Sequence, residues 1–263
     1  MKGLGRLAFL LRSRAPLWVI AAYYRLHLAY QVGKRLGGRP RTYAERAAAF
    51  ARAKAGLELD HDWFTGNLPR WLWIFEKFGF RGRSEVRCLE IGSWQGLSAW
   101  FVLHELPGAR ITCVDTWGGA DEHHADLQGS RERISNAERV FDRNLRPFAD
   151  RVEKYRGTSL SWFASRTGPE TFDLVYVDGS HHCDDVMVDA VKCFEMLAVG
   201  GVMIFDDYFW RYYEDARDNA AGAINAFLRL HRHRLRIVSF GHQLAVQKTG
   251  EASRAIGGAS APA

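Results

Sequence analysis

The sequence has 263 residues and a formal charge of +6, from 36 basic and 30 acidic residues. With 47% apolar and 13% aromatic residues it can fill a sizeable core, which excludes a globally disordered chain. The charge is uneven, because residues 1–41 hold nine Lys and Arg residues and no acid, so the remainder carries a net charge of −3. A protein that coats nucleic acid needs a basic face on its folded domain. We therefore expect no nucleic-acid partner.

The basic leader, residues 1–41, comes first in the chain. Its longest uncharged apolar stretch, residues 15–24, is too short for a membrane-spanning helix, which needs about 20 apolar residues. No small-residue cleavage site follows a clean apolar run, so a secretory signal is not expected. An organellar transit peptide is weakly supported, because the leader is rich in Arg and free of acids but has a single serine, Ser13. Two main interpretations remain. The leader is either an amphipathic segment on an anionic membrane surface or a helical extension that packs on the domain or a dimer partner.

The four cysteines form no C-x-x-C pair and have no disulfide-dense spacing. Scattered thiols of this kind are typical of a reducing compartment. We therefore predict a cytoplasmic protein, with contact to the membrane surface left open by the leader.

An aromatic-rich segment, residues 60–80, opens the body of the chain. We predict a helix that packs across a sheet, with Trp63 or Phe64 as an alternative cover for a ligand. From residue 86 onward, short apolar runs alternate with helical patterns. The predicted strands are 86–91, 110–115, 151–156, 172–177 and 202–205, followed by a hairpin of 235–239 and 244–248.

Helices are predicted between these strands. They cover 95–106, 134–144, a short turn after residue 159, residues 186–197 up to a stop at Gly200-Gly201, and 216–230. The alternation predicts a single α/β domain with a mostly parallel sheet, whose ligands bind at the carboxyl ends of the strands. We assign residues 1–56 to a helical extension, 57–249 to the domain and 250–263 to a flexible tail, since the last segment is rich in Gly, Ala and Ser.

The first predicted strand ends in a glycine-containing turn. Residues 90–96 read EIGSWQG, an E-x-G-x-x-x-G pattern. A dinucleotide site has G-x-G-x-x-G instead, because its backbone amides must approach a pyrophosphate anion. The acid Glu90 would repel that anion but suits a ligand with an ammonium or sulfonium group. The glycines still let the backbone approach a ligand closely.

Polar residues also end the second and third predicted strands. Asp115 stands where an acid commonly binds the ribose hydroxyls of an adenosine-containing ligand, although it can also cap a turn. Thr158 and Ser159 follow the third strand, where they could meet an adenine edge or cap the next helix. The first three strand ends therefore predict a nucleoside site.

Acidic residues follow the fourth and fifth predicted strands. Asp178 ends one strand, and the pair Asp206-Asp207 ends the other. If the strands are neighbours, the three carboxylates meet and repel one another unless a cation joins them. Oxygen ligands favour Mg²⁺ or Mn²⁺ over zinc. His181 stands beside this cluster as a candidate general base.

These residues resemble the class I S-adenosylmethionine-dependent methyltransferases over about residues 60–249. Within that class, the run from residue 177 to 208, VDGSHHCDDVMVDAVKCFEMLAVGGVMIFDDY, resembles the metal-dependent small-molecule O-methyltransferases of the macrocin type, which act on sugar hydroxyls. The family usually has an aromatic residue where this chain has Cys183, so the resemblance does not extend to that acceptor contact.

The resemblance implies a Rossmann-like domain with a seven-stranded sheet in the order 3-2-1-4-5-7-6 and helices on both faces. It implies S-adenosylmethionine as methyl donor, Mg²⁺ (or Mn²⁺), a small sugar-like hydroxyl acceptor and a homo-oligomer. His181 would be the catalytic base, and the metal ligands would be Asp178, Asp206 and Asp207. The predicted donor-binding residues are Glu90, Gly92, Ser93, Gly96, Asp115, Thr116, Thr158, Ser159 and Asp178.

Two other functions remain as alternatives at this level. A nicotinamide-dependent oxidoreductase is disfavoured by the acid in the first turn and by the absent G-x-G-x-x-G. A non-catalytic binding protein on the same fold is disfavoured by the intact carboxylates and His181. We expect a methyltransferase of class EC 2.1.1.- that acts on a hydroxyl group.

Overall fold

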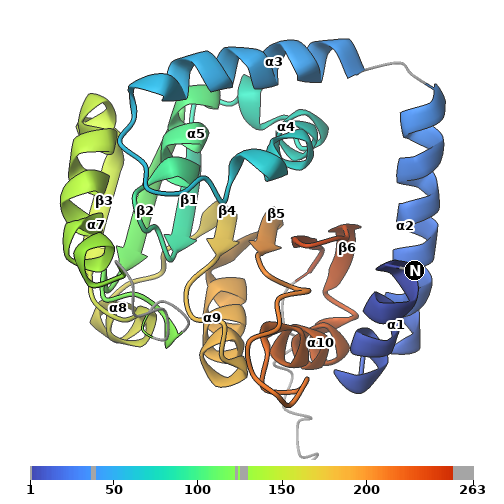
Figure 1. Cartoon of the computed structure of the whole chain (residues 1–263). Helices are drawn as coiled ribbons and strands as arrows, with labels where there is room; N and C mark the ends of the chain where they lie inside the picture. Colours follow the sequence, from blue (N-terminus) through green and yellow to red (C-terminus); the bar gives the residue numbers. More distant parts are fainter. Residues whose placement is uncertain (1, 37–39, 122–123, 125–129, 251–263) are drawn as a thin grey trace, which may run out of the picture.

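A computed structural model of the chain describes residues 2–36, 40–121, 124 and 130–250. Seven strands form one sheet in the order β3-β2-β1-β4-β5-β7-β6, which confirms the predicted order (Figure 1). β7 pairs antiparallel with β5 and β6, and the other pairs are parallel. The strands are β1 (Val86–Ile91), β2 (Ala109–Asp115), β3 (Val152–Arg156), β4 (Phe172–Val177), β5 (Leu197–Phe205), β6 (Leu235–Ser239) and β7 (Leu244–Lys248).

The central strands are apolar on both faces because helices cover both sides of the sheet. One face packs against α3, α4, α5 and α7, and the other against α1, α2, α8, α9 and α10. Figure 1 shows α4 and α5 on one side of the strands and α9 and α10 on the other. The helix bounds are α1 (Lys2–Arg12), α2 (Leu17–Leu36), α3 (Pro40–Ala53), α4 (Leu68–Lys77), α5 (Leu97–Glu105), α7 (Ser130–Leu145), α8 (Ser159–Ser165), α9 (Cys183–Met196) and α10 (Ala220–His231).

The N-terminal helices are part of this packing. Phe50 of α3 contacts the rings of Trp100 and Phe101 of α5, at centroid distances of 5.8 and 5.1 Å. Phe9 of α1 and Val19 of α2 are buried in the core on the opposite face. The leader therefore packs on the domain, as one of its two interpretations expected. The predicted boundary at residue 56 falls at the end of a 3₁₀ turn, Lys54–Gly56.

The start of β5 differs from the prediction. The sequence predicted a helix as far as Gly200-Gly201, but α9 ends at Met196 and β5 begins at Leu197. Phe172 pairs with Leu197 while Leu174 pairs with Val202, so β5 has three extra residues that bulge from the ladder. Gly200, with φ +89°, makes this turn possible. The glycines thus mark a bulge inside a strand and do not end the helix.

Two further observations concern the ends of the chain. Among the described residues, no helix combines the length and apolar character that crossing a bilayer requires. The predicted flexible tail begins at Gly250 and otherwise lies outside the residues that the structure describes.

Candidate active site

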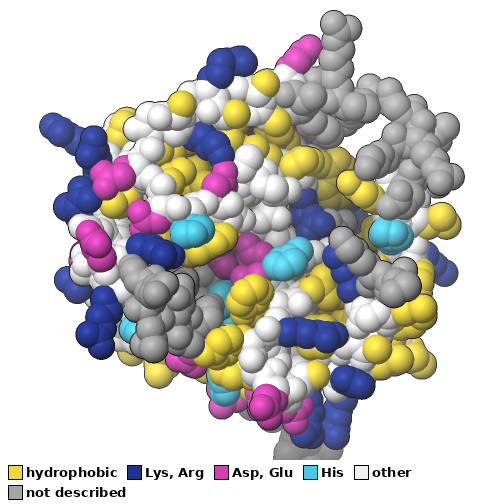
Figure 2. All heavy atoms as spheres, viewed as in Figure 1, with side chains coloured by type: hydrophobic (Ala, Val, Ile, Leu, Met, Phe, Trp, Pro, Cys, Tyr) yellow, Lys and Arg dark blue, Asp and Glu magenta, His cyan; other side chains and the backbone are white. Residues whose placement is uncertain are grey.

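A cavity of about 1070 Å³ opens at the carboxyl edge of the parallel strands. It is larger than most ligand pockets, which measure about 300–1,000 Å³, and has room for two small molecules. Residues at the ends of β1, β2, β3, β4 and β5 line it. Figure 2 shows acidic and histidine side chains at the centre of this face, with hydrophobic side chains around them. The predicted strand-end residues therefore meet at one site.

The turn after β1 approaches the end of β4 closely. Asp178 N donates to Ile91 O at 2.8 Å, and Gly92 has φ +84°. A Cβ on Gly92 would lie 1.9 Å from the backbone oxygen of Asp178. Glycine is therefore required here for two reasons, its left-handed backbone and the space that β4 occupies.

Asp115 at the end of β2 holds this turn in place. Its Oδ2 accepts hydrogen bonds from the backbone amides of Ser93 (2.7 Å) and Trp94 (2.8 Å), and its Oδ1 accepts one from Trp117 N (2.6 Å). Trp94 and Trp117 have φ values of +44° and +49°, which a large side chain adopts only when its surroundings enforce it. Asp115 therefore caps the turn and also lines the cavity, as does the next residue, Thr116.

Glu90 lies beneath the turn. Its carboxylate is buried, accepts a hydrogen bond from Ser93 Oγ at 2.7 Å and lies 3.7 Å from Cys113 Sγ. Burial raises the pKa of this carboxyl from 4.5 to about 7. Gly96 has φ +80° and immediately precedes α5. Neither Glu90 nor Gly96 lines the cavity. Their direct contact with a donor stays a prediction.

The end of β3 supplies Thr158 and Ser159, which both line the cavity. Thr158 also caps α8, because its Oγ1 accepts a hydrogen bond from Ser161 N at 3.1 Å. Behind them lies Asp189 of α9, which the sequence did not single out. Its side chain is buried, and burial raises its pKa to about 6. Its place in a regular helical pattern offered no signal that it would reach the cavity.

Three carboxylates meet above β4 and β5, as predicted. The hydroxyl of Tyr176 lies 2.9 Å from Asp178 Oδ2 and also contacts Asp206 Oδ2. Asp207 N donates to Asp206 Oδ1 at 2.7 Å, and Asp207 has φ +51°. A strained backbone at this position turns the second aspartate toward the site.

Two histidines complete the cluster. His181 Nε2 lies 2.9 Å from Asp207 Oδ2 and 4.0 Å from Asp178 Oδ1. On the other side, His242 Nδ1 lies 3.4 Å from Asp207 Oδ1 and 3.7 Å from Asp206 Oδ1. Ligand atoms of Asp178, His181 and Asp207 lie within 4.8 Å of one another, as do those of Asp206, Asp207 and His242. This set of oxygen-rich donors fits a hard divalent cation.

The charges of the cluster are unbalanced without a cation. Burial and the neighbouring charge of Asp206 raise the pKa of Asp178 well above its usual value. Burial alone would raise the pKa of Asp206 as well. Hydrogen bonds from His242, Tyr176 and Gln243 have the larger combined effect, so the pKa of Asp206 is lowered. The hydrogen bond with Asp206 raises the pKa of His242. A bound dication would remove this repulsion between the carboxylates.

Three of these residues were missed by sequence reasoning. Tyr176 lies two residues before Asp178 on the same strand, so the alternation of side chains could have placed it beside that aspartate. His242 and Gln243 lie in the turn before β7, and no motif connects them to the cluster. Gln243 Nε2 donates to Asp206 Oδ2 at 2.8 Å, and its Oε1 accepts from Trp71 Nε1 at 2.9 Å.

Aromatic side chains form the rim of the cavity. Trp63 is 57% exposed and stacks on His61 at 5.3 Å, and Trp210 lies 6.1 Å from His181. All four line the cavity. The segment 60–80 therefore contains both predicted features, since its first part covers the cavity and α4 packs on the sheet.

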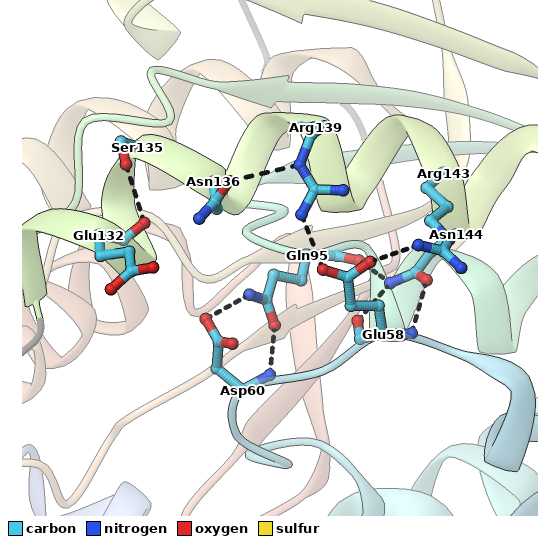
Figure 3. A network of polar contacts seen from close by, with 9 residues as sticks. All are labelled: Glu58, Asp60, Gln95, Glu132, Ser135, Asn136, Arg139, Arg143 and Asn144. Atoms are coloured by element: carbon cyan, nitrogen blue, oxygen red, sulfur yellow. Dashed lines mark hydrogen bonds and ion pairs between the residues drawn. The ribbon is translucent and has the colours of Figure 1, made fainter.

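Hydrogen bonds anchor the segment that carries Trp63 (Figure 3). Asp60 N donates to Gln95 Oε1 at 2.9 Å, and Gln95 Nε2 donates to Asp60 Oδ2 at 2.7 Å. Asn144 Nδ2 donates to Glu58 O at 2.9 Å and to Gln95 O at 2.9 Å. These hydrogen bonds connect the segment before Trp63 to the turn after β1 and to α7.

The other side of the rim contains Trp210 but not Tyr208. The side chain of Tyr208 is fully buried, and its hydroxyl lies 2.6 Å from Asn225 Oδ1. Cys183, the position where the resembling family has an aromatic, is not a cavity residue. It begins α9, which is capped by the His182 side chain.

Comparison with known proteins shows what this arrangement is similar to. Residues 89–208 match a family model described as a methyltransferase domain. No curated protein sequence matches the chain. Together with the sheet order, this match over less than half of the chain shows a Rossmann-like methyltransferase fold.

Solved structures share this fold at low identity. A proposed O-methyltransferase from Klebsiella pneumoniae is 18% identical, with 84% of this chain and 96% of that chain covered and a TM-score of 0.50. The cofactor-bound Rv0187 from MTB is 18% identical, with 80% and 91% covered and a TM-score of 0.51.

A structure that contains Mg and SAH is also among these. The MycE methyltransferase of the mycinamycin pathway, in complex with Mg, SAH and mycinamycin VI, is 18% identical, with a TM-score of 0.52. The match covers 90% of this chain but 65% of MycE.

Proposed function

We propose that this protein transfers a methyl group from S-adenosylmethionine to a hydroxyl group of a small, sugar-like molecule, with the assistance of Mg²⁺ or Mn²⁺. The observation that carries the proposal is the cluster of Asp178, Asp206 and Asp207 with His181 against Asp207. These groups lie in the same cavity as the turn after β1 and the ends of β2 and β3. Donor and acceptor sites are therefore adjacent.

The donor would occupy the part of the cavity next to β1, β2 and β3. Gly92 lets the backbone approach it, and Asp115 faces its ribose hydroxyls with a carboxylate that the turn already orients. Thr158 and Ser159 offer hydroxyls to an adenine edge. This placement leaves Asp178 between the donor and acceptor regions.

The metal and the donor supply the reactive groups. When bound, the cation lowers the pKa of the acceptor hydroxyl and the donor offers an electrophilic methyl group. Asp178, Asp206 and Asp207 would hold the cation. His181 would accept the hydroxyl proton, and the Asp207 carboxylate, whose Oδ2 lies 2.9 Å from His181 Nε2, would stabilise the resulting imidazolium.

The acceptor would lie between the carboxylates and the aromatic rim. Trp63 and Trp210 offer flat apolar surfaces that suit the apolar face of a sugar ring, while the cluster recognises hydroxyls. MycE, whose structure contains Mg, SAH and mycinamycin VI, supports a small-molecule acceptor. By the same resemblance we propose a homo-oligomer, and the free cysteines support a cytoplasmic location.

A methyl-transfer assay with isotopically labelled donor and a panel of glycosides tests the proposal. Asp206→Asn should lower turnover by about 100-fold or more, because it removes a charge from the metal site, while SAH affinity stays within about twofold. Asp142→Asn, which changes an exposed acid of α7, is the matched control and should keep full activity. EDTA should abolish turnover, and full activity in EDTA would refute the metal role.

A further inference from the structure

Helices α1 and α2 have apolar residues on two opposite faces. The inner face contains Phe9, Leu10, Val19 and Tyr23, which are buried against the domain. The opposite face is apolar too but lies in solvent. Its members, which we call the outer stripe, are Leu4, Leu11, Leu17, Tyr24 and Leu28, with exposed fractions of 74, 54, 81, 51 and 65%.

The spacing of the outer stripe shows that it is a continuous surface along α2. Leu17, Ala21, Tyr24 and Leu28 recur at intervals of four, three and four residues, which places them on one side of an α-helix. Single exposed leucines are ordinary, but an aligned series marks an interaction site. Because the inner face already anchors both helices to the domain, this series is not needed for that packing.

The charge beside the outer stripe indicates its partner. Arg12 and Arg25 are exposed on the same helices, Arg14 is exposed in the turn between them, and residues 1–41 contain no acid. Figure 2 shows hydrophobic and basic side chains together on the right-hand edge, where Figure 1 has α1 and α2. A second copy bound through this face would bring like charges together, whereas an anionic lipid surface complements both features.

We propose that the outer stripe docks this protein on anionic lipid bilayers as a peripheral protein. The leucines and Tyr24 would enter the headgroup boundary, with the arginines at the level of the lipid phosphates.

The inner face links this surface to the active site. Arg211 Nη2 donates to Gly5 O at 3.3 Å, and the guanidinium of Arg6 lies 5.0 Å from the ring centre of Phe209. Phe209 and Arg211 follow Asp207 by two and four residues in the chain. A docked α1 would therefore place the acidic end of the cavity close to the bilayer.

Vesicle flotation with the full chain tests the proposal. We expect binding to vesicles that contain phosphatidylglycerol, little binding to pure phosphatidylcholine, and weaker binding at high salt. The double variant Leu17→Gln/Leu28→Gln should bind the anionic vesicles at least about tenfold more weakly, because it removes two leucines that would enter the bilayer. The control Val199→Gln/Leu230→Gln changes residues of comparable exposure on the body, 55 and 64%, and should bind as the native chain does.

Three results would overturn the proposal. They are no binding to anionic vesicles, an equal loss of binding in the control variant, and an outer-stripe variant that dissociates an oligomer in light scattering with its vesicle binding unchanged. Thermal unfolding of both variants checks that the fold is kept. The test does not use methyl transfer, so its failure is distinct from failure of the proposed function.

Discussion

The close approach of the turn after β1 to β4 makes a quantitative prediction for Gly92→Ala. Gly92 (φ +84°) and Gly200 (φ +89°) have nearly the same φ, but their surroundings differ. A Cβ on Gly92 would lie 1.9 Å from Asp178 O, whereas one on Gly200 meets nothing within 4 Å. Gly200→Ala therefore measures the left-handed backbone cost by itself, about 1–2 kcal/mol.

Gly92→Ala adds the overlap with a backbone oxygen that cannot rotate away. Overpacking of this kind costs about 1–3 kcal/mol, so the total loss of unfolding free energy should be about 2–5 kcal/mol. Urea denaturation of both variants gives the two values. Calorimetric titration with SAH should show weaker binding for Gly92→Ala and unchanged binding for Gly200→Ala. Equal losses of stability in the two variants would refute the reasoning.

Two further predictions concern buried polar groups of the site. Tyr176→Phe removes the hydroxyl that contacts Asp178 and Asp206. The affinity for Mn²⁺, measured by calorimetry, should therefore fall about 10–100-fold. An unchanged affinity would show that the hydroxyl does not orient these ligands. The pKa of Glu90 is raised from 4.5 to about 7, so ionisation opposes folding: its cost is absent below pH 4.5 and complete above pH 7. As the pH rises from 4.5 to 8, the unfolding free energy of Glu90→Gln should therefore rise by up to about 3 kcal/mol relative to that of the native chain. Urea denaturation at several pH values measures this difference, and a difference that does not change with pH would contradict the reasoning.

Local pattern was enough to predict most of the strand-end residues that line the cavity, including the three carboxylates. Apolar runs that end in Asp115, Asp178 and Asp206 read directly as strands with polar ends. In a parallel sheet these ends lie on one edge, so their meeting follows from the class of fold. The bulge at Gly200 was missed because a glycine pair after a helical pattern has the same sequence appearance whether it ends a helix or bends a strand.

The sequence by itself determined the alternation of strands and helices, the glycine turn and the acidic strand ends, because backbone period and residue type are local properties. Only the tertiary structure decided which distant groups join them. Pairing of β5 with β7 brings His242 and Gln243 to Asp206, and Tyr208 is buried rather than on the rim. Packing likewise decided which face of the basic leader covers the domain. These outcomes depend on contacts between segments far apart in the chain, which no local pattern records.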